Sequence, residues 1–406
     1  MAEALSNIRV LDLSRVLAGP WATQILADLG AEVTKIERPG VGDETRAWGP
    51  PYHKDGNGRD TSESAYYLCA NRNKRSVTVD MNTPQGQALL IRLAQDSDVI
   101  VENFKVGSLK RYGLDYESVR ARAPQVVYCS ITGFGQTGPY ASRPGYDFLI
   151  QAAAGLMSVT GQPDGEPGAG PVKAGVAVSD ILTGLYATVG ILAALASRQR
   201  TGVGQHIDIS LLDVQVACMA NQAASYLASG KIPKRLGNGH PTVVPYEDFP
   251  TADASMILAI GNDAQFRKFC EVSGRAELAT DARFATNAAR VEHRTDLIPL
   301  MRRITVERTC AEWQTLLSPA GVPCGPINDL AAVFADPHVI TRKMRLKLPH
   351  QSGQVDSVAN PIRLSETPIQ YRYGPPVLGE HTDEVLRERL KLSEPEIAEL
   401  RREKVI

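Results

Sequence analysis

The sequence predicts an α/β protein in which a large domain is built on a Rossmann-like parallel sheet and a smaller domain is α+β. Two observations lead to this fold class. Short apolar runs alternate with helical runs through the first half of the chain, a pattern typical of parallel sheets covered by helices. After about residue 230 the apolar runs become shorter and lie among polar, amphipathic helices. The 406 residues are enough for two or three domains of ordinary size.

The strands of the large domain are short, apolar and bounded by turn residues. Strands are predicted at Ile8–Leu13, Ala31–Glu37, Ser76–Met81, Asp98–Glu102 and Gln125–Ile131, with helices at Gly19–Leu29 and Pro84–Gln95. The second helix has proline at its first position, where no backbone N–H is needed. Ligands of such sheets bind at the carboxyl ends of the strands, and the segments ERPG, VENF and ITGFG all fall there.

The remaining segments set the domain boundaries. An apolar run at Ser255–Ile260 and amphipathic helices at Ala264–Ser273 and Arg290–Ile304 belong to the smaller domain. Pro349–Pro376 is rich in Pro, Ser and Gln and is expected to be a connection, whereas Leu378–Val405 is helical and highly charged. The predicted division is a large domain of residues 1–215 completed by 377–406, a small domain of residues 230–336, and linkers at 216–229 and 337–376.

The composition is that of a soluble intracellular enzyme, and the expected location is the cytoplasm. A formal net charge of −1 with 22% charged residues indicates no nucleic-acid partner. The six cysteines show no CxxC or zinc spacing, so neither a metal site nor a disulfide framework is expected. The N-terminus has no apolar signal core. The uncharged run Ile181–Ser197 is shorter than a membrane span of about 20 residues, so we expect a buried core helix and no membrane contact.

The segment from Gly133 to Gly138 matches the GxGxxG pattern of dinucleotide-binding turns and follows a predicted strand. However, Pro139 and Pro144 stand where the helix of such a turn would begin. No acidic residue lies about 20 positions further on to hold a ribose. We therefore do not expect a nicotinamide cofactor.

Asp180 stands at the start of the long uncharged run and is the strongest candidate for a chemical role. Backbone N–H groups point outward at a helix start and the helix dipole is positive there, so a carboxylate is held ionised and oriented. Such a carboxylate can act as a nucleophile. From the local sequence alone, however, capping the helix is the more common role of an aspartate at this position.

Motifs along the whole chain bear on this choice. They are VLDLSRVLAGPWATQILADLGAEVTKIERPGVGDETRAWGP (Val10–Pro50), NRNKRSVTVDM (Asn71–Met81), DVIVENFKVGSLKRYGL (Asp98–Leu114), SITGFGQTGPYASRPGYD (Ser130–Asp147), GQHIDISLLD (Gly204–Asp213), RLGNGHP (Arg235–Pro241), GVPCGPIND (Gly321–Asp329) and LGEHTDEVL (Leu378–Leu386). Through them the chain closely resembles the class III coenzyme A transferases, the family of formyl-CoA transferase and carnitine CoA-transferase. Within this family it is most similar to the succinyl-CoA:glutarate CoA-transferase subgroup, through NRNKRS, RLGNGHP and VPYEDF.

The resemblance implies a mechanism and a set of site residues. Asp180 would form an anhydride with the donor acyl group and then an aspartyl–CoA thioester, which the acceptor acid attacks. No cofactor is required, because the coenzyme A thioester is itself a substrate. The residues implied to contact coenzyme A are Arg38, Val79, Asn82, Asn103, Phe104, Arg111 and Tyr146, and those implied near the acyl group are Val16, Leu17 and His240. Asn82 stands where formyl-CoA transferase carries lysine, so that lysine's cationic contact has no counterpart here.

The expected acceptor is a dicarboxylate of four to six carbons, glutarate first, with succinyl-CoA as donor. The second carboxylate of such an acid needs a cation or several N–H donors in the pocket. Arg46, in the DETRAWGP loop, is the first candidate for this cation and His240 the second, unless Arg46 pairs with Asp43 or Glu44 on the surface. Members of the family form interlocked dimers in which each chain is threaded through the other, and the resemblance implies the same homodimer here.

Other functions remain open at this point. The racemase branch of the family moves a proton with the equivalent aspartate and the histidine of a GHD motif. Here that motif is Gly145-Tyr146-Asp147, and neutral tyrosine is a poor base at pH 7. A non-catalytic acyl-CoA-binding protein is a further alternative, although Asp180 and the glycine-rich loops count against it.

Overall fold

The computed structural model describes residues 3–406, which divide into two units by their contacts. The first unit contains the chain up to Leu156, Ala174–Leu227 and Pro337–Ile406, and the second contains Met157–Lys173 and Ala228–Asp336. The division expected from the sequence differs in three segments. Residues 157–173 join the small unit, whereas most of the two segments expected as linkers, 216–229 and 337–376, belong to the large one.

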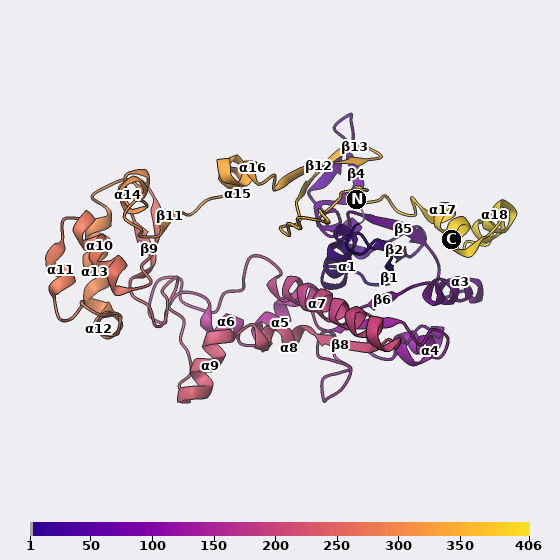
Figure 1. Ribbon diagram of the computed structural model, residues 1–406, viewed down its shortest axis with the longest axis horizontal. Helices are drawn as coiled ribbons and strands as arrows, with labels where there is room; N and C mark the ends of the chain where they lie inside the picture. Colours follow the sequence, from indigo (N-terminus) through magenta and orange to yellow (C-terminus); the bar gives the residue numbers. More distant parts are fainter. Residues whose placement is uncertain (1–2) are drawn as a thin grey trace. The chain divides into compact units, whose positions relative to one another are not determined.

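The first unit is an α/β domain with a six-stranded, fully parallel sheet, which confirms the predicted fold class (Figure 1). The strand order is β5-β2-β1-β6-β7-β8, so the order reverses at β1. Sites of parallel sheets lie at the carboxyl ends of strands near such a reversal. The strand bounds are β1 Arg9–Asp12, β2 Glu32–Glu37, β5 Lys74–Thr78, β6 Val99–Glu102, β7 Val127–Thr132 and β8 His206–Ser210.

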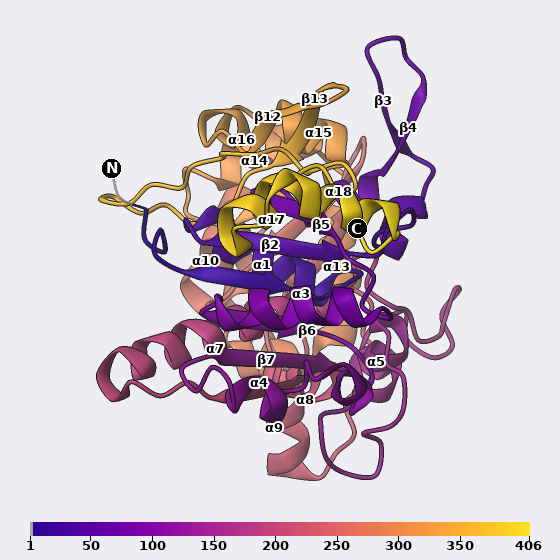
Figure 2. The ribbon, with the colours of Figure 1, turned by 90° about the vertical axis from the view of Figure 1, so that its right-hand side faces the viewer.

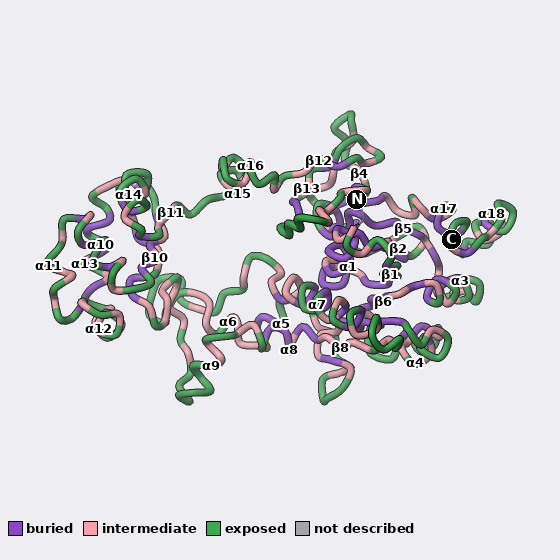
Figure 3. The backbone as a smooth tube through the Cα atoms, viewed as in Figure 1, coloured by how far each residue is buried: buried purple, intermediate pink, exposed green. Residues whose placement is uncertain are grey.

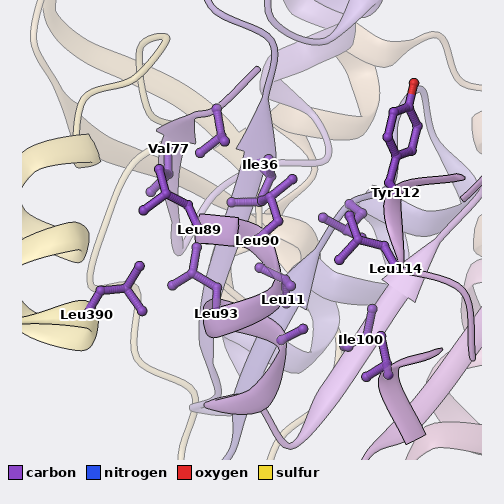
Figure 4. Packing of buried hydrophobic residues seen from close by; sticks show 14 of the residues in the cluster. Leu11, Ile36, Val77, Leu89, Leu90, Leu93, Ile100, Tyr112, Leu114 and Leu390 are labelled. Carbon is purple, nitrogen blue, oxygen red and sulfur yellow. The ribbon is translucent and has the colours of Figure 1, made fainter. Parts of the chain in front are cut away.

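Two apolar clusters cover the two faces of this sheet, because successive strand residues point to opposite sides. Leu11 belongs to one cluster and its neighbour Val10 to the other. The first cluster packs the sheet against four helices, two of which come from the C-terminal end of the chain (Figures 2 and 4). The four helices are α3 Pro84–Gln95, α4 Tyr116–Arg120, α17 Thr382–Leu390 and α18 Glu394–Arg402. The second packs it against α1 Ala18–Asp28, α5 Asp147–Ala153, α7 Val178–Thr201 and α8 Leu211–Ala217.

Helix α7 packs in the core as its composition predicted, although part of its surface is exposed. It packs against α1, β7 and β8, yet Leu185, Tyr186 and Val189 are exposed on it (Figure 3). Within residues 3–406, α7 is the one helix long and apolar enough to cross a membrane by length and composition, a test that core helices of soluble proteins also pass. The helix ends at Gly202, whose φ of 72° gives the left-handed residue common after helices.

The second unit is a small α+β fold with its own core. Three antiparallel strands, in the order β11-β10-β9, pack against helices around Trp313, Phe249 and Phe266. The helix predicted at Arg290–Ile304 is interrupted at His293 and forms two helices. The bounds are β9 Tyr246–Pro250, β10 Ser255–Ala259, β11 Cys324–Pro326, α10 Asp263–Val272, α11 Ala276–Thr280, α12 Asn287–Glu292, α13 Arg294–Thr305, α14 Cys310–Leu317 and α15 Leu330–Ala335.

Two hairpins in the large unit were not predicted. One is formed by β3 Tyr52–Lys54 and β4 Asp60–Ser64, and the other by β12 Arg345–His350 and β13 Gly353–Val358. The second hairpin occupies part of the stretch expected to be a connection, and its Leu348 and Val355 pack with Tyr67 in a small core of their own. The remaining elements are η1 Glu44–Ala47, α2 Ala65–Leu68, η2 Ser108–Tyr112, α6 Leu156–Val159, α9 Ala220–Ser229 and α16 Pro337–Thr341.

Candidate active site

Asp180 lies in the first turn of α7 but does not cap the helix. The N-cap residue is Ala177, which makes no side-chain cap. The cap comes instead from Asp147, the first residue of α5. Its Oδ1 accepts the N–H groups of Ser179 at 2.8 Å and Asp180 at 3.4 Å, and its Oδ2 accepts Nε2 of Gln151 at 2.6 Å. The capping role considered for Asp180 is therefore filled by another residue, and its own carboxylate is free for other contacts.

The surroundings of Asp180 disfavour its charged form. Among residues 3–406, no group donates a hydrogen bond to its carboxylate. Burial raises the pKa of Asp180 to about 7, and the nearby charge of Asp147 adds to this effect. The sequence had suggested that the helix start would keep this carboxylate ionised. The pKa is raised instead, because burial and the charge of Asp147 outweigh any benefit of the helix start, whose N–H groups of Ser179 and Asp180 are bound by Asp147. A poorly hydrated carboxylate that titrates near neutral pH is suited to nucleophilic attack.

A first pocket, with a volume of about 180 Å³, contains Asp180. It lies at the carboxyl ends of β1, β6 and β7, and it brings together several residues that the sequence had implicated. These are Val16, Leu17, Asn103, Phe104, Tyr146 and Asp180, and the cations Arg15, Lys105 and Arg143 also line it. Arg15 is paired with Glu44 at 2.7 Å, whereas Lys105 and Arg143 form no ion pair within the described part of the chain.

A second pocket, of about 310 Å³, adjoins the first and shares Arg15, Glu44 and Phe104 with it. It lies at the ends of β2 and β5 and is lined by Arg38, Val79 and Asn82. Arg38 is exposed and makes no ion pair within residues 3–406. Asn82 accepts a hydrogen bond from the Tyr112 hydroxyl at 2.9 Å. A free cation beside apolar and amide groups suits a phosphate-bearing ligand with a flat heterocycle.

The wall between the two pockets is held by backbone contacts. The side chain of Asn103 donates to the carbonyl of Arg15 at 2.6 Å and accepts its N–H at 2.9 Å. The next residue, Val16, has a φ of 69°, which is rare and costly for a β-branched side chain. Asp43 accepts the Val16 N–H with both oxygens at 3.3 Å, and Lys35 in turn holds Asp43 at 2.9 Å. This buried pair, which the sequence did not reveal, keeps the strained loop in place.

Arg46 does not have the role expected for it. Its guanidinium is 5% exposed and lines neither pocket. It donates to both oxygens of Glu37, at 2.8 and 2.7 Å, and also to Tyr67 and to the carbonyl of Pro376. A guanidinium with these partners cannot also hold a substrate carboxylate. The surface pairing with Asp43 or Glu44 is likewise wrong, since the partner is the buried Glu37.

Two other predicted residues also lie outside these pockets. Arg111 is exposed, and its guanidinium lies 4.5 Å from the ring centre of Tyr112, which lines the second pocket. His240 belongs to the second unit, where its N–H donates to the carbonyl of Tyr246 at 3.0 Å and its Nδ1 accepts the Thr242 N–H at 3.2 Å. These contacts shape the GNGHP turn, and the role of His240 toward substrate stays a prediction.

Tyr66 and Trp48 are near neighbours of the site that sequence reasoning missed. Burial raises the pKa of Tyr66 to about 12, and the charge of Asp180 is the next largest cause. The Tyr66 ring lies 5.1 Å from that of Trp48 in an edge-on arrangement. Neither stands in a spacing that signals chemistry, so only the fold reveals them. Asp147 could have been found, because it ends the Gly145-Tyr146-Asp147 motif.

The first glycine of the GxGxxG segment serves close packing of the backbone, whereas Gly135 and Gly138 have positive φ angles of 89° and 90°. A Cβ atom at Gly133 would lie 2.6 Å from the Cα of Gly145. The end of β7 and the loop before α5 can therefore approach this closely only because both residues are glycine. Helix α5 begins at Asp147, nine residues beyond Gly138, and not directly after the glycines. The segment therefore lacks the helix that a dinucleotide-binding turn requires.

Comparison with known proteins agrees with this geometry. The family model of CoA-transferase family III matches residues 5–382. The chain belongs to this family. It is 51% identical over 385 residues to the succinate–glutarate CoA-transferase of Agrobacterium fabrum, covering 95% of each chain. It is 42% identical over 399 residues to the human succinyl-CoA:glutarate CoA-transferase, covering 98% of this chain and 89% of that protein. The crystal structure of a CaiB/BaiF family protein from Brucella suis matches this transferase with a TM-score of 0.84 and 47% identity, over 96% of this chain and 100% of that one.

Proposed function

We propose that this CoA-transferase moves coenzyme A from succinyl-CoA to glutarate or a similar dicarboxylate of four to six carbons. The observation that carries the proposal is Asp180, a carboxylate that accepts no hydrogen bond from residues 3–406 and faces a pocket adjoining a second, cationic one. The names of the Agrobacterium and human relatives support the choice of both substrates. Matches to oxalate-, mesaconate- and citramalate-specific transferases are 37–38% identical, and so favour these acids less.

In the proposed reaction, coenzyme A occupies the second pocket near Arg38, Val79, Asn82 and Phe104, and its thioester reaches Asp180. The Asp180 carboxylate attacks the thioester carbonyl, forming an anhydride and releasing CoA thiolate. The thiolate then attacks the Asp180 carbonyl, which frees succinate and leaves an aspartyl–CoA thioester. Glutarate repeats the sequence in reverse and leaves as glutaryl-CoA. No net proton is transferred, and no cofactor enters the reaction.

Lys105 and Arg143 replace Arg46 as the cations available to anionic groups in the first pocket. Each lines that pocket and has no carboxylate partner among the described residues. Arg143 lies over the ring of Tyr140, 3.9 Å from its centre, on the loop that leads to Tyr146. The distal carboxylate of the acid and the phosphates of coenzyme A both need such cations.

The test is a panel of acids offered to the purified protein with succinyl-CoA, with the acyl-CoA products measured by mass spectrometry. The panel contains glutarate, adipate, butyrate, oxalate, mesaconate, formate and carnitine. The highest kcat/KM is expected for glutarate. A higher value for oxalate, mesaconate, formate or carnitine would refute the substrate assignment while leaving CoA transfer intact.

Racemisation of a 2-methylacyl-CoA is disfavoured in this site. It needs a base beside Asp180, and the residue at that point of the motif is Tyr146, which is 64% exposed. Asp147 is occupied by the N–H groups of α7 and by Gln151. Incubating a 2-methylacyl-CoA in deuterated water provides the check, since uptake of deuterium at the α-carbon would restore the racemase alternative.

We also propose a cytoplasmic homodimer. The exposed apolar residues of α7, Leu185, Tyr186 and Val189, form a surface that a second copy could cover. All six cysteines are free, as fits a reducing compartment. Sedimentation at nanomolar concentration should give a dimer, and a stable folded monomer would contradict the proposal.

A further inference from the structure

Glu102 is a buried carboxyl group without a cationic partner. It ends β6 and directly precedes Asn103 and Phe104, which line the pockets. It is 5% exposed, and it forms no ion pair within residues 3–406. Its Oε2 accepts the backbone N–H of Phe104 at 2.8 Å. Burying a carboxyl group without a compensating charge is costly, so its presence here calls for an explanation.

Two side chains from the neighbouring strands complete the surroundings of Glu102. Ser130 pairs with Glu102 in the register of β6 and β7, and hydrogen bonding from its side chain acts to lower the pKa of Glu102. Ser130 Oγ lies 2.9 Å from Nε2 of His206 on β8, at hydrogen-bonding distance. The three side chains therefore lie next to one another on three adjacent strands.

This arrangement is not a hydrolytic site. Ser130 is 2% exposed, so no substrate can reach its hydroxyl. A proton relay also has no task in CoA transfer, because the reaction moves no net proton. The three side chains are linked to the pockets through the backbone N–H of Phe104, which donates to Glu102, because Phe104 lines both pockets.

We propose that Glu102 is a positioning residue, whose carboxylate, braced by Ser130 and His206, fixes Phe104 at the junction of the two pockets and thereby sets the affinity for coenzyme A. The proposal rests on the assignment of the second pocket to coenzyme A. Phe104 lines both pockets, and the Arg15 guanidinium lies 4.9 Å from the centre of its ring. Loss of the Phe104 tether would therefore shift both the aromatic wall and the cation above it.

The charge state of Glu102 bears on this role. Burial raises the pKa of Glu102 to about 7, against the lowering effect of Ser130 and the Phe104 N–H. A carboxylate accepts an N–H more strongly than a carboxylic acid does. Because the pKa is raised, the stronger tether exists above about pH 7 and is lost as the pH falls.

Other titratable groups lie around Glu102, Ser130 and His206. Lys105 and Lys110 follow Glu102 on the loop and in η2, Asp115 and Glu117 lie at the start of α4, and Tyr128 and Cys129 precede Ser130 on β7. On β8, burial lowers the pKa of His206, although Asp208 and Glu117 act in the opposite direction.

The test compares Glu102→Gln and Glu102→Ala, both in an Asp180→Asn background so that the nucleophile does not titrate. Glutamine keeps an oxygen for the Phe104 N–H and an amide group for Ser130 but cannot ionise. Binding of free coenzyme A is measured by calorimetry from pH 6 to pH 8.5. Glu117→Gln is the matched control, because Glu117, Glu102 and His206 all line a further pocket, of about 280 Å³, that Phe104 does not line.

With Glu102 present, coenzyme A should bind about 5-fold more weakly at pH 6 than at pH 8, beyond the change seen in Glu102→Gln. At pH 8, Glu102→Ala should raise the dissociation constant about 10-fold and Glu102→Gln less than about 2-fold. In the otherwise native enzyme, Glu102→Ala should raise KM for the CoA thioester while kcat changes little.

A pH dependence that persists unchanged in Glu102→Gln, or a folded Glu102→Ala variant that binds coenzyme A normally, would overturn the proposal. If Glu102→Ala does not fold, the glutamine variant and its pH dependence alone decide. If no variant binds coenzyme A, the assignment of the second pocket fails. If coenzyme A binds but glutarate is not used, only the substrate assignment fails.

Discussion

The buried carboxylates of the large unit fall into two groups with opposite electrostatics. Asp12, Glu37 and Asp43 are paired with Lys74, Arg46 and Lys35, and Glu37 and Asp43 also line the second pocket. Burial alone would raise their pKa values, but these cations and several hydrogen bonds hold the pKa values below the usual range. Asp180, which lines the first pocket, and Glu102, which lines neither of the two pockets but directly precedes Asn103 and Phe104, have no cationic partner among the described residues, and their pKa values are raised to about 7.

The difference separates structural from chemical carboxylates. The paired carboxylates accept hydrogen bonds from buried or strained parts of the backbone, such as the Val16 N–H. Because their pKa values are lowered, they stay ionised across the physiological pH range. The unpaired group can change charge near neutral pH, which a nucleophile or a pH-sensitive tether requires. Substitutions in the two groups should therefore have different consequences.

Replacing the unpaired nucleophile should have the largest effect on catalysis. Asp180→Asn keeps the size of the side chain and removes the attacking oxygen anion. We expect CoA transfer to fall by about 10³-fold or more, as for other covalent nucleophiles, while the protein stays folded. The rate is measured as glutaryl-CoA formation from succinyl-CoA. A residual rate within about 10-fold of the wild-type rate would show that Asp180 is not the nucleophile, because loss of a covalent nucleophile costs far more.

Breaking a paired group should instead cost stability. Arg46→Met leaves Glu37 buried without its cation and should lower the free energy of unfolding by about 3–5 kcal/mol. The control is Arg345→Met, which breaks an exposed pair with Asp356 and should leave the free energy of unfolding nearly unchanged. Both are measured by urea denaturation.

The same Arg46 variant also tests substrate choice. Because its guanidinium faces Glu37 and not the pocket, the ratio of kcat/KM for glutarate to that for butyrate should stay near the wild-type value in the folded fraction. A selective loss of glutarate use would return Arg46 to the substrate site.

The pH dependence of catalysis should follow the unpaired group. Only ionised Asp180 can attack, and its pKa is raised to about 7. The kcat/KM for succinyl-CoA should therefore be about 10-fold lower at pH 6 than at pH 8. Measuring Glu102→Gln in parallel removes the part of the slope due to the tether. A flat profile between these pH values would show that Asp180 is ionised well below neutral pH.

Asp180 should also have a smaller effect on the free energy of unfolding. Its raised pKa makes stability fall as the pH rises, whereas the lowered pKa of a paired carboxylate makes stability rise. Since the pKa of Asp180 is raised in the folded state, folding retains a proton that the unfolded chain releases, and stability falls as the pH rises from about 4 to 7. Asp180→Asn removes this cost and should stabilise the protein at pH 8 by about 1–2 kcal/mol, allowing for partial exposure. The gain should vanish near pH 3. Destabilisation at pH 8 would contradict the raised pKa.

Much of the fold was predictable because local signals agree with the tertiary structure. Helix α3 begins at Pro84 and ends at Gln95 as expected, with Thr83 as its cap. Strand β5, however, was expected at Ser76–Met81 and lies at Lys74–Thr78. It begins with Lys74 and Arg75, and a sequence pattern gives no reason to bury charges whose partners lie elsewhere in the chain. Strand β8, the segment HIDIS, was missed for the same reason, since its polar His206 and Asp208 hide the strand signal.

A site residue was predictable where its role depends on the neighbouring sequence, and was not predictable where its role depends on residues that only the fold brings near it. Asp180 stands out by its position before an uncharged helix and by its motif. Arg46 could not be judged in this way, because its partner Glu37 faces it only after the loop that follows β2 has folded back. Glu102 was equally hidden, since its raised pKa depends on the absence of a cation in a three-dimensional neighbourhood.

The most direct test of the central claim is to trap the covalent intermediate. The enzyme is incubated with succinyl-CoA, quenched with hydroxylamine or borohydride, digested and mapped by mass spectrometry. We expect a modified Asp180 in the peptide from α7, with Asp147 and Glu102 unmodified. A modification on any other residue, or none during turnover, would contradict it.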